Sequence, residues 1–165
     1  MSKYELIVNY AKCTGCRLCE TSCAIGHTGE ANPVKSRVRI VKVEGEADII
    51  CIPVKCMSCE NPPCQAVCPT QAISTHPETG SKIVDKDRCI GCNSCAFACP
   101  FGAIVVDRSV GTSIVCDQCD GDPLCARFCP WEAIVYARSE DLGMKLKRDR
   151  ASRLIDLLQS PISLS

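Results

Sequence analysis

The chain is short of aromatic residues, of net charge and of long apolar runs. Three Phe, three Tyr and one Trp occur among 165 residues, so a conventional core of large side chains is thin for this length. Nineteen Lys plus Arg balance nineteen Asp plus Glu, which gives no electrostatic reason to bind nucleic acid or an anionic membrane. No stretch approaches the roughly 18 apolar residues of a membrane span. Something other than the burial of large side chains must hold the fold.

The N-terminal stretch MSKYELIVNY has no apolar signal region, no twin arginine and no small-residue cleavage site. We therefore expect a cytoplasmic protein, although a chain without its own signal can be exported with a partner. Seventeen cysteines make up about a tenth of the sequence. In a reducing compartment such a chain binds metal more often than it forms disulfides.

Sixteen of the seventeen cysteines fall into four groups, CTGCRLCETSC, CMSCENPPCQAVC, CIGCNSCAFAC and CDQCDGDPLCARFC. The first group is Cys13, Cys16, Cys19 and Cys23; the second is Cys56, Cys59, Cys64 and Cys68; the third is Cys89, Cys92, Cys95 and Cys99; the fourth is Cys116, Cys119, Cys125 and Cys129. The hexamers CPTQAI, CPFGAI and CPWEAI close groups two, three and four. The repetition indicates internal duplication.

Short strands are predicted between and after these groups. The pattern predicts strands in 4–10, 36–43, 48–54, 72–75, 103–107, 112–116 and 133–137. Residues 72–85 read as a β-hairpin with Pro77 and Gly80 in its turn. The expected fold is α+β, with short hairpins and single helical turns wrapped around metal sites.

The C-terminal extension, 138–165, has no cysteine and differs in kind from the rest. We predict an amphipathic helix over 139–159, capped by Ser139 and stopped by Ser160 and Pro161. Its apolar stripe and basic middle fit a helix that packs on its own domain or one that docks on a partner subunit.

The third group has the spacing C-x2-C-x2-C-x3-C-P, which is the bacterial ferredoxin run that ligates [4Fe–4S] clusters. Three cysteines spaced by two residues bind three irons from one tight loop. The fourth serves the neighbouring cluster, and we expect it to start a helical turn in which proline is tolerated. Groups two and four have longer loops before the third cysteine, and group one lacks the proline, but none of them loses a ligand.

Three alternatives fit less well. Tetrahedral zinc sites usually take their ligands from two C-x2-C pairs in separated segments. Disulfides suit neither the compartment nor the close spacing of the cysteines. A catalytic cluster with an open iron needs fewer than four cysteines. Sixteen cysteines divide evenly into four complete sets. Electron transfer without substrate binding is the simplest consequence, and a zinc-stabilised interaction module is the rival from another class.

With this motif order, residues 4 to about 137 resemble the four-cluster, ferredoxin-like iron–sulfur subunits of multisubunit oxidoreductases. The resemblance implies four [4Fe–4S] clusters in one domain, 1–137, built as two pseudo-symmetric halves. Groups one and four form one half, and groups two and three form the other. The implied ligand sets are Cys13, Cys16, Cys19 and Cys129; Cys23, Cys116, Cys119 and Cys125; Cys56, Cys59, Cys64 and Cys99; and Cys68, Cys89, Cys92 and Cys95. In such relatives the clusters form a line.

The resemblance also implies a partner. Related subunits serve dimethyl sulfoxide reductase-type molybdenum and tungsten enzymes, formate dehydrogenases, hydrogenases, carbon monoxide dehydrogenases and tungsten aldehyde oxidoreductases. We expect a non-catalytic relay between a molybdenum- or tungsten-pterin subunit and a flavin or ferredoxin partner, and the compact length is similar to the small subunits of tungsten aldehyde oxidoreductases. A hydrogenase or carbon monoxide dehydrogenase relay and a free polyferredoxin are the alternatives. A line of clusters that is exposed at both ends also allows the chains to associate end to end into filaments.

The remaining candidates are single residues. Cys51, in the apolar run IICIPV, is expected to be a buried structural thiol, and His27 and His76 are expected in loops. Trp131, next to Cys129 and Pro130, is expected to shield a cluster from water.

Charge suggests an order of reduction potentials. Asp117, Asp120 and Asp122 lie among the ligands of the fourth group, whereas Lys12 and Arg17 flank those of the first. Because an electron is harder to add beside carboxylates, we expect the fourth-group cluster to have the lower potential of the two.

Overall fold

The computed structural model describes residues 4–45, 48–138, 140–141 and 151. The strands are β1 (Tyr4–Val8), β2 (Arg39–Glu44), β3 (Ile49–Val54), β4 (Ile73–Thr75), β5 (Lys82–Val84), β6 (Val105–Asp107), β7 (Thr112–Ile114) and β8 (Ile134–Arg138). The α-helices are α1 (Leu18–Thr28), α2 (Pro63–Ala66), α3 (Ser94–Ala98) and α4 (Leu124–Arg127). Three 3-10 turns, η1 (Tyr10–Lys12), η2 (Pro33–Lys35) and η3 (Gln118–Gly121), complete the described elements.

The strands form four separate antiparallel ribbons, β1–β8, β2–β3, β4–β5 and β6–β7. Each strand predicted from the sequence is present, and the predicted hairpin over 72–85 is β4–β5. Its turn is closed by the His76 N–H, which donates to the Ser81 carbonyl at 2.8 Å. The expected α+β fold with short hairpins is confirmed. The eleven-residue helix α1 is longer than the single turns expected.

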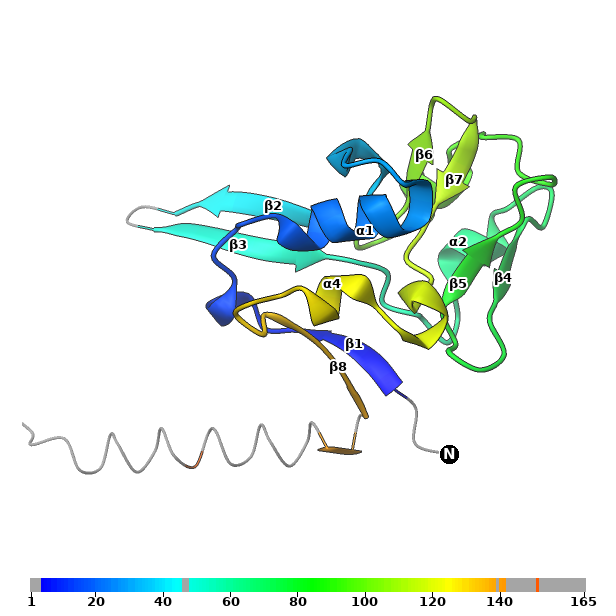
Figure 1. Cartoon of the computed structure of the whole chain (residues 1–165). Helices are drawn as coiled ribbons and strands as arrows, with labels where there is room; N and C mark the ends of the chain where they lie inside the picture. Colours follow the sequence, from blue (N-terminus) through cyan, green and yellow to red (C-terminus); the bar gives the residue numbers. More distant parts are fainter. Residues whose placement is uncertain (1–3, 46–47, 139, 142–150, 152–165) are drawn as a thin grey trace, which may run out of the picture.

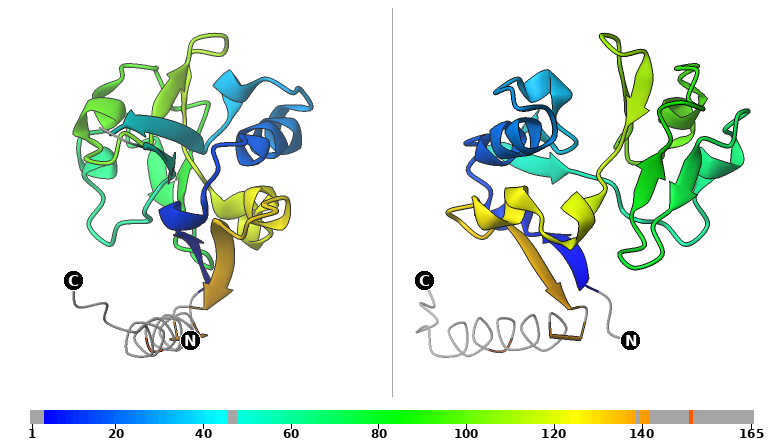
Figure 2. Two further views of the ribbon diagram at one scale, coloured as in Figure 1. Left: turned by 90° about the vertical axis from the view of Figure 1, so that its left-hand side faces the viewer. Right: turned by 45° about the vertical axis from the view of Figure 1, so that its right-hand side comes forward.

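The ribbons lie on two sides of the molecule. Helices α1 and α4 pack together, with β1–β8 below them and β2–β3 beside them (Figure 1). The ribbons β4–β5 and β6–β7 and the helix α2 occupy the other side, as all the views show (Figure 2). Strand β8 returns to pair with β1 over five residue pairs. The first and fourth cysteine groups therefore share one side, and the second and third share the other.

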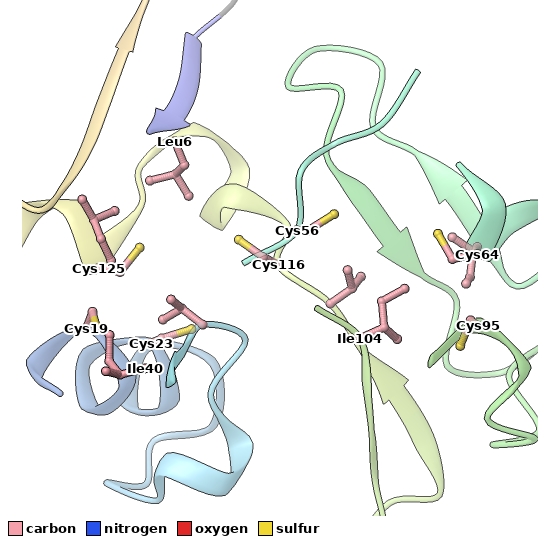
Figure 3. Packing of buried hydrophobic residues seen from close by; sticks show 14 of the residues in the cluster. Leu6, Cys19, Cys23, Ile40, Cys56, Cys64, Cys95, Ile104, Cys116 and Cys125 are labelled. Carbon is pink, nitrogen blue, oxygen red and sulfur yellow. The ribbon is translucent and has the colours of Figure 1, made fainter. Parts of the chain in front are cut away.

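The core is rich in sulfur and poor in aromatic side chains. Eight of the fifteen residues in the buried apolar cluster are cysteines, and none is aromatic. Figure 3 shows Cys19, Cys23 and Cys125 near Ile40 on one side and Cys64 and Cys95 on the other, with Ile104 between the two sets. Aromatic side chains lie outside the cluster, and Phe97 is 89% exposed. The thin conventional core expected from the composition is what the structure shows.

The predicted C-terminal helix over 139–159 falls almost wholly outside the described residues. Within the part of the chain that the structure describes, none of the helices is both long and apolar enough to cross a membrane.

Candidate functional site

Four cavities, A to D, are each lined by four cysteines. Cavity A is lined by Cys13, Cys16, Cys19 and Cys129; cavity B by Cys23, Cys116, Cys119 and Cys125; cavity C by Cys56, Cys59, Cys64 and Cys99; cavity D by Cys68, Cys89, Cys92 and Cys95. Their empty volumes are similar, at 300, 360, 310 and 290 Å³ in that order. Each cavity thus combines three cysteines of one group with the last cysteine of another. All seventeen cysteines, which lie within the described residues, are free of disulfides.

The loop that carries the first two cysteines of each group contains a left-handed residue. The residue before the second cysteine has positive φ in all four groups: Gly15 at 72°, Ser58 at 49°, Gly91 at 65° and Gln118 at 60°. This conformation turns backbone N–H groups inward, and those of Gly15, Ser58 and Gln118 oppose the rise in the pKa that burial causes at the first cysteine of their groups. Oriented amides of this kind form a concave site for an anion.

The repeated Cys-Pro-x-x-Ala segments form one turn three times. The N–H of the residue three positions on donates to the carbonyl of Cys68, Cys99 and Cys129 at 3.2 Å each. The next N–H, always from an alanine, donates to the same cysteine's Sγ at 3.2, 3.5 and 3.3 Å. Proline is suited to the second position of such a turn.

This geometry corrects the expectation that the fourth cysteine starts a helical turn. Helices α2, α3 and α4 end before or at Cys68, Cys99 and Cys129. The proline stops the helix, because the residue before a proline is biased away from helical geometry.

Group one differs for a visible reason. Cys23 lies inside α1, which continues to Thr28, so a proline after Cys23 would break the helix. A distant N–H replaces the missing turn: that of Arg37 donates to the Cys23 Sγ at 3.3 Å. The last cysteine of every group therefore accepts one backbone hydrogen bond.

Burial keeps the most buried thiols protonated until a metal ion replaces the proton. It raises the pKa of Cys19 and of Cys116 to about 12. By contrast, Cys92 is exposed, and its hydrogen bonding with Ser94 lowers its pKa. Metal binding displaces thiol protons, so a cavity lined by four cysteines suits a metal cluster better than it suits solvent.

Two buried lysines give a second indication of anionic occupants. Lys55 and Lys82 are 8% and 3% exposed, line cavities B and C respectively, and have no carboxylate within ion-pair distance among the described residues. A buried ammonium without a counter-ion is costly. Thiolate-ligated iron–sulfur clusters carry negative charge, so the residues fit this cofactor. Neither lysine was a candidate in the sequence, where Lys55 follows an apolar strand and Lys82 follows the turn residues Gly80 and Ser81.

A second unexpected group lies beside cavity B. The His27 Nε2 is 3.5 Å from the Cys119 Sγ and 3.6 Å from the Asp117 Oδ1, and Arg37 forms an ion pair with Asp117. Burial and then the charge of Arg37 lower the pKa of His27, although Asp117 opposes the shift. Burial acts to raise the pKa of Asp117, but the hydrogen bond and the charge of Arg37 outweigh burial, so the pKa is lowered. The expectation of a loop position for His27 was wrong, because α1 extends to Thr28.

These ion pairs remove much of the charge difference expected between two sites. Asp117 pairs with Arg37, and Asp122 pairs with Arg127 at 2.8 Å. At cavity A, Lys12 and Glu132 are 3.6 Å apart, and Arg17 and Glu20 are 4.0 Å apart. The predicted order of potentials treated all three aspartates as unpaired. That premise fails for Asp117 and Asp122, and the order itself stays a prediction.

The other single residues lie near their expected places. Cys51 is buried, and a Cβ added to Gly15 would lie 2.6 Å from its Sγ, so it packs beneath the first cysteine loop. Trp131 lines cavity A and is 54% exposed, so it covers the rim. His76 lies in the β4–β5 turn, where its Nδ1 accepts from the Glu78 and Thr79 N–H groups.

Four thiol-lined cavities at ferredoxin spacings define a class, the iron–sulfur proteins that transfer electrons. Comparison with known proteins agrees: residues 47–138 match the 4Fe-4S dicluster domain, and the chain belongs to this family. It is 36% identical over 112 residues to the polyferredoxin-like subunit of an aliphatic sulfonate oxidoreductase from Pyrococcus furiosus, covering 68% of this chain and 63% of that protein.

Two further relatives are similar over a comparable share of the chain. A putative electron transport protein of Escherichia coli, YsaA, is 40% identical over 68% of this chain and 73% of its own length. A tetrathionate reductase subunit from Salmonella typhimurium is 33% identical over 69% of this chain and 47% of its own. The chain thus spans less than two thirds of the first and third of these relatives. The chain thus carries a 4Fe-4S dicluster domain, and its cysteines suffice for four [4Fe–4S] clusters.

Proposed function

We propose that cavities A to D each hold one [4Fe–4S] cluster on their four cysteines and that the chain relays electrons along them. The observation that carries this proposal is that sixteen cysteines divide among four cavities without remainder, each set crossing between two groups. Each cluster supplies one-electron redox chemistry, and the protein supplies thiolates, amide donors and burial.

The cavities follow one another in the order A, B, C, D. Cys19 of cavity A and Cys125 of cavity B are close enough to interact electrostatically, and so are Cys116 of cavity B and Cys56 of cavity C. Figure 3 shows Cys116 and Cys56 near each other where the two sides of the molecule meet, with their sulfur atoms pointing in opposite directions. Helix α2 carries Cys64 of cavity C and is followed by Cys68 of cavity D. Helix α3 carries Cys95 of cavity D and is followed by Cys99 of cavity C. This order supports a linear relay through two ferredoxin-like halves, with 1–137 as one domain and 138–165 as an extension.

The partners belong to the same proposal. The relatives' names support a place beside the catalytic subunit of an oxidoreductase, which we propose to be a molybdenum- or tungsten-pterin subunit, with a flavoprotein or ferredoxin at the other end. A small tungsten aldehyde oxidoreductase subunit fits the compact chain. A hydrogenase or carbon monoxide dehydrogenase relay comes second, and a free polyferredoxin comes third. Association of the chains end to end into filaments is a separate part of the proposal. A reducing cytoplasm suits so many free thiols.

Anaerobic purification through a tag on this chain tests the proposal. We expect a brown protein with about sixteen irons per chain, together with a co-purifying subunit that contains tungsten or molybdenum. A colourless zinc protein would refute the cofactor, and a monodisperse brown chain without other subunits would favour the free polyferredoxin. Deleting 139–165 tests the extension: we expect weaker subunit association with unchanged iron, whereas loss of iron would assign the extension to the domain core.

Ligand crossing has its own test. Cys23→Ser should perturb the cluster in cavity B, and Cys129→Ser should perturb the cluster in cavity A. Paramagnetic resonance of the reduced variants distinguishes the two clusters. Anomalous iron density that places Cys23 and Cys13 on the same cluster would overturn the assignment.

A further inference from the structure

Two buried cations lie close to cavity C. Lys82 opens β5, and its Nζ donates to the Thr75 Oγ1 at 2.8 Å across the β4–β5 ribbon. Lys55 directly precedes Cys56, and its Nζ donates to the Cys56 carbonyl at 3.0 Å. Both hydrogen bonds are to neutral oxygens, so neither ammonium is neutralised by its partner. Lys82 is the one charged residue in the described lining of cavity C.

The position of Lys55 extends its influence to two cavities. Its side chain lines cavity B, while its neighbour Cys56 belongs to cavity C. The Lys55 ammonium therefore lines cavity B and is also within hydrogen-bond distance of the backbone of a cavity C ligand.

The other cavities lack such a pair of cations. At cavity A the charged lining residue is Arg17, which is half-exposed and close to Glu20. At cavity B, Arg37 is paired with Asp117, which leaves Lys55 as the unpaired cation. Cavity D has no charged residue in its described lining. Its hydroxyls are its distinguishing feature, and the Ser113 Oγ is 3.2 Å from the Cys95 Sγ.

We propose that Lys55 and Lys82 make the cluster in cavity C the first of the four to be reduced, so that an electron entering the protein comes to rest at this inner position. This inference rests on the proposed ligand sets. Reduction adds one negative charge to a cluster, and a fixed buried cation stabilises that charge. The same charge on an exposed lysine is screened by water and salt. A hydroxyl donor such as Ser113 supplies a dipole instead of a full charge, so we rank cavity D second.

The test is a redox titration of the purified, iron-loaded protein followed by paramagnetic resonance. The signal that Cys64→Ser perturbs identifies the cluster in cavity C. Lys82→Met keeps the length of the side chain and removes its charge, whereas Lys82→Arg keeps the charge. We expect Lys82→Met to lower the equilibrium constant for reducing this cluster about tenfold, which is about 59 mV for a one-electron couple. Lys82→Arg should restore most of that loss.

Lys55→Met and an exposed control complete the series. Lys55→Met should lower the potentials of both inner clusters, B and C, because Lys55 lies between them. Lys86→Met, at an exposed lysine after β5, should leave the potential of the cluster in cavity C unchanged. Iron content is measured in every variant, so that failure to assemble a cluster is separated from a change in its potential.

Each contrary result has a distinct meaning. Native protein with fewer than four clusters, or Cys64→Ser that perturbs no signal, would count against the ligand sets and hence the proposed function. Four clusters with an unchanged potential in Lys82→Met would overturn the inference alone. If the first reduced signal is instead the one altered by Ser113→Ala, hydroxyl donors outweigh buried cations and the electron rests in cavity D.

Discussion

The third residue of each Cys-x-x-Cys loop decides whether the loop can close. Gly91 has φ of 65°, and a Cβ placed on it would lie 2.3 Å from the Gly111 carbonyl oxygen in the β6–β7 turn. This backbone carbonyl cannot move aside as the end of a flexible side chain can. Ser58 and Gln118 show that positive φ alone is tolerated at this position, so close approach is the stronger constraint at Gly91.

Gly91→Ala should therefore lose the cluster in cavity D. We expect about four irons fewer per chain, because the added methyl separates the loop of group three from β6–β7. Gly102→Ala is the matched control: its φ is 61°, but no atom lies within 4 Å of the added methyl. Iron analysis of both variants makes the comparison. Equal losses would show that φ, and not the contact with Gly111, governs the site.

Cys51 provides a second residue-scale test, because it supports a cluster loop without belonging to a ligand set. Cys51→Ala should keep the full iron content at a cost of about 1 kcal/mol in stability. Cys51→Leu should push against Gly15 and lose iron from cavity A, with overpacking of about 1–3 kcal/mol. Iron analysis and the temperature of cluster loss report both effects. Loss of a whole cluster in Cys51→Ala would instead make this thiol a ligand.

At the scale of the element, one buried carboxylate joins α1 to β2. Glu20 is 2% exposed, and its Oε1 accepts the Ile40 N–H at 2.7 Å. The bond fixes the helix that carries Cys19 and Cys23 against the β2–β3 ribbon. Its Oε2 has no hydrogen-bond partner among the described residues, so the carboxylate is held by this one bond and by Arg17 at 4.0 Å.

Glu20→Ala should leave the Ile40 N–H buried without an acceptor, at a cost of about 1–3 kcal/mol. Glu20→Gln keeps an oxygen for this N–H and should retain most of the stability. Thermal loss of the cluster absorbance, measured anaerobically, should begin several degrees lower in the alanine variant. Equal behaviour of the two variants would mean that charge, and not the hydrogen bond, holds α1.

What the sequence predicted at this scale follows from local spacing. The four cysteine groups, the seven strand segments and the β4–β5 hairpin depend on residues close together in the chain, and all of them are present. The roles of Lys55, Lys82 and His27 depend on tertiary packing. Arg37 and Asp117, for example, are 80 residues apart, and no local pattern shows that their charges cancel. The helix α1 escaped prediction because its cysteines were read as a loop followed by one turn.

At the scale of the whole molecule, the four sites differ in how far water reaches them. Cavities A and D at the ends of the row each include an exposed cysteine, Cys16 and Cys92 respectively. Cavities B and C have none, and Cys116, Cys125, Cys56 and Cys64 are each at most 8% exposed. Cavities A and D are thus suited to exchange electrons with partners, and cavities B and C are suited to protect the electrons from solvent.

This gradient predicts that clusters are lost from the ends inward. When the oxidised protein is treated with an iron chelator, we expect about half of the iron to leave in a fast phase and the rest in a slow one. The fast phase should remove the signals assigned to cavities A and D, because Cys16 and Cys92 are open to attack without unfolding. The inner clusters require the two sides of the molecule to separate first. Cys92→Ser should accelerate the loss from cavity D alone, since an oxygen ligand at this exposed position weakens only that site. A single phase for all the iron would instead mean that global opening limits the loss, and that the difference in burial between the ends and the middle does not protect the inner clusters.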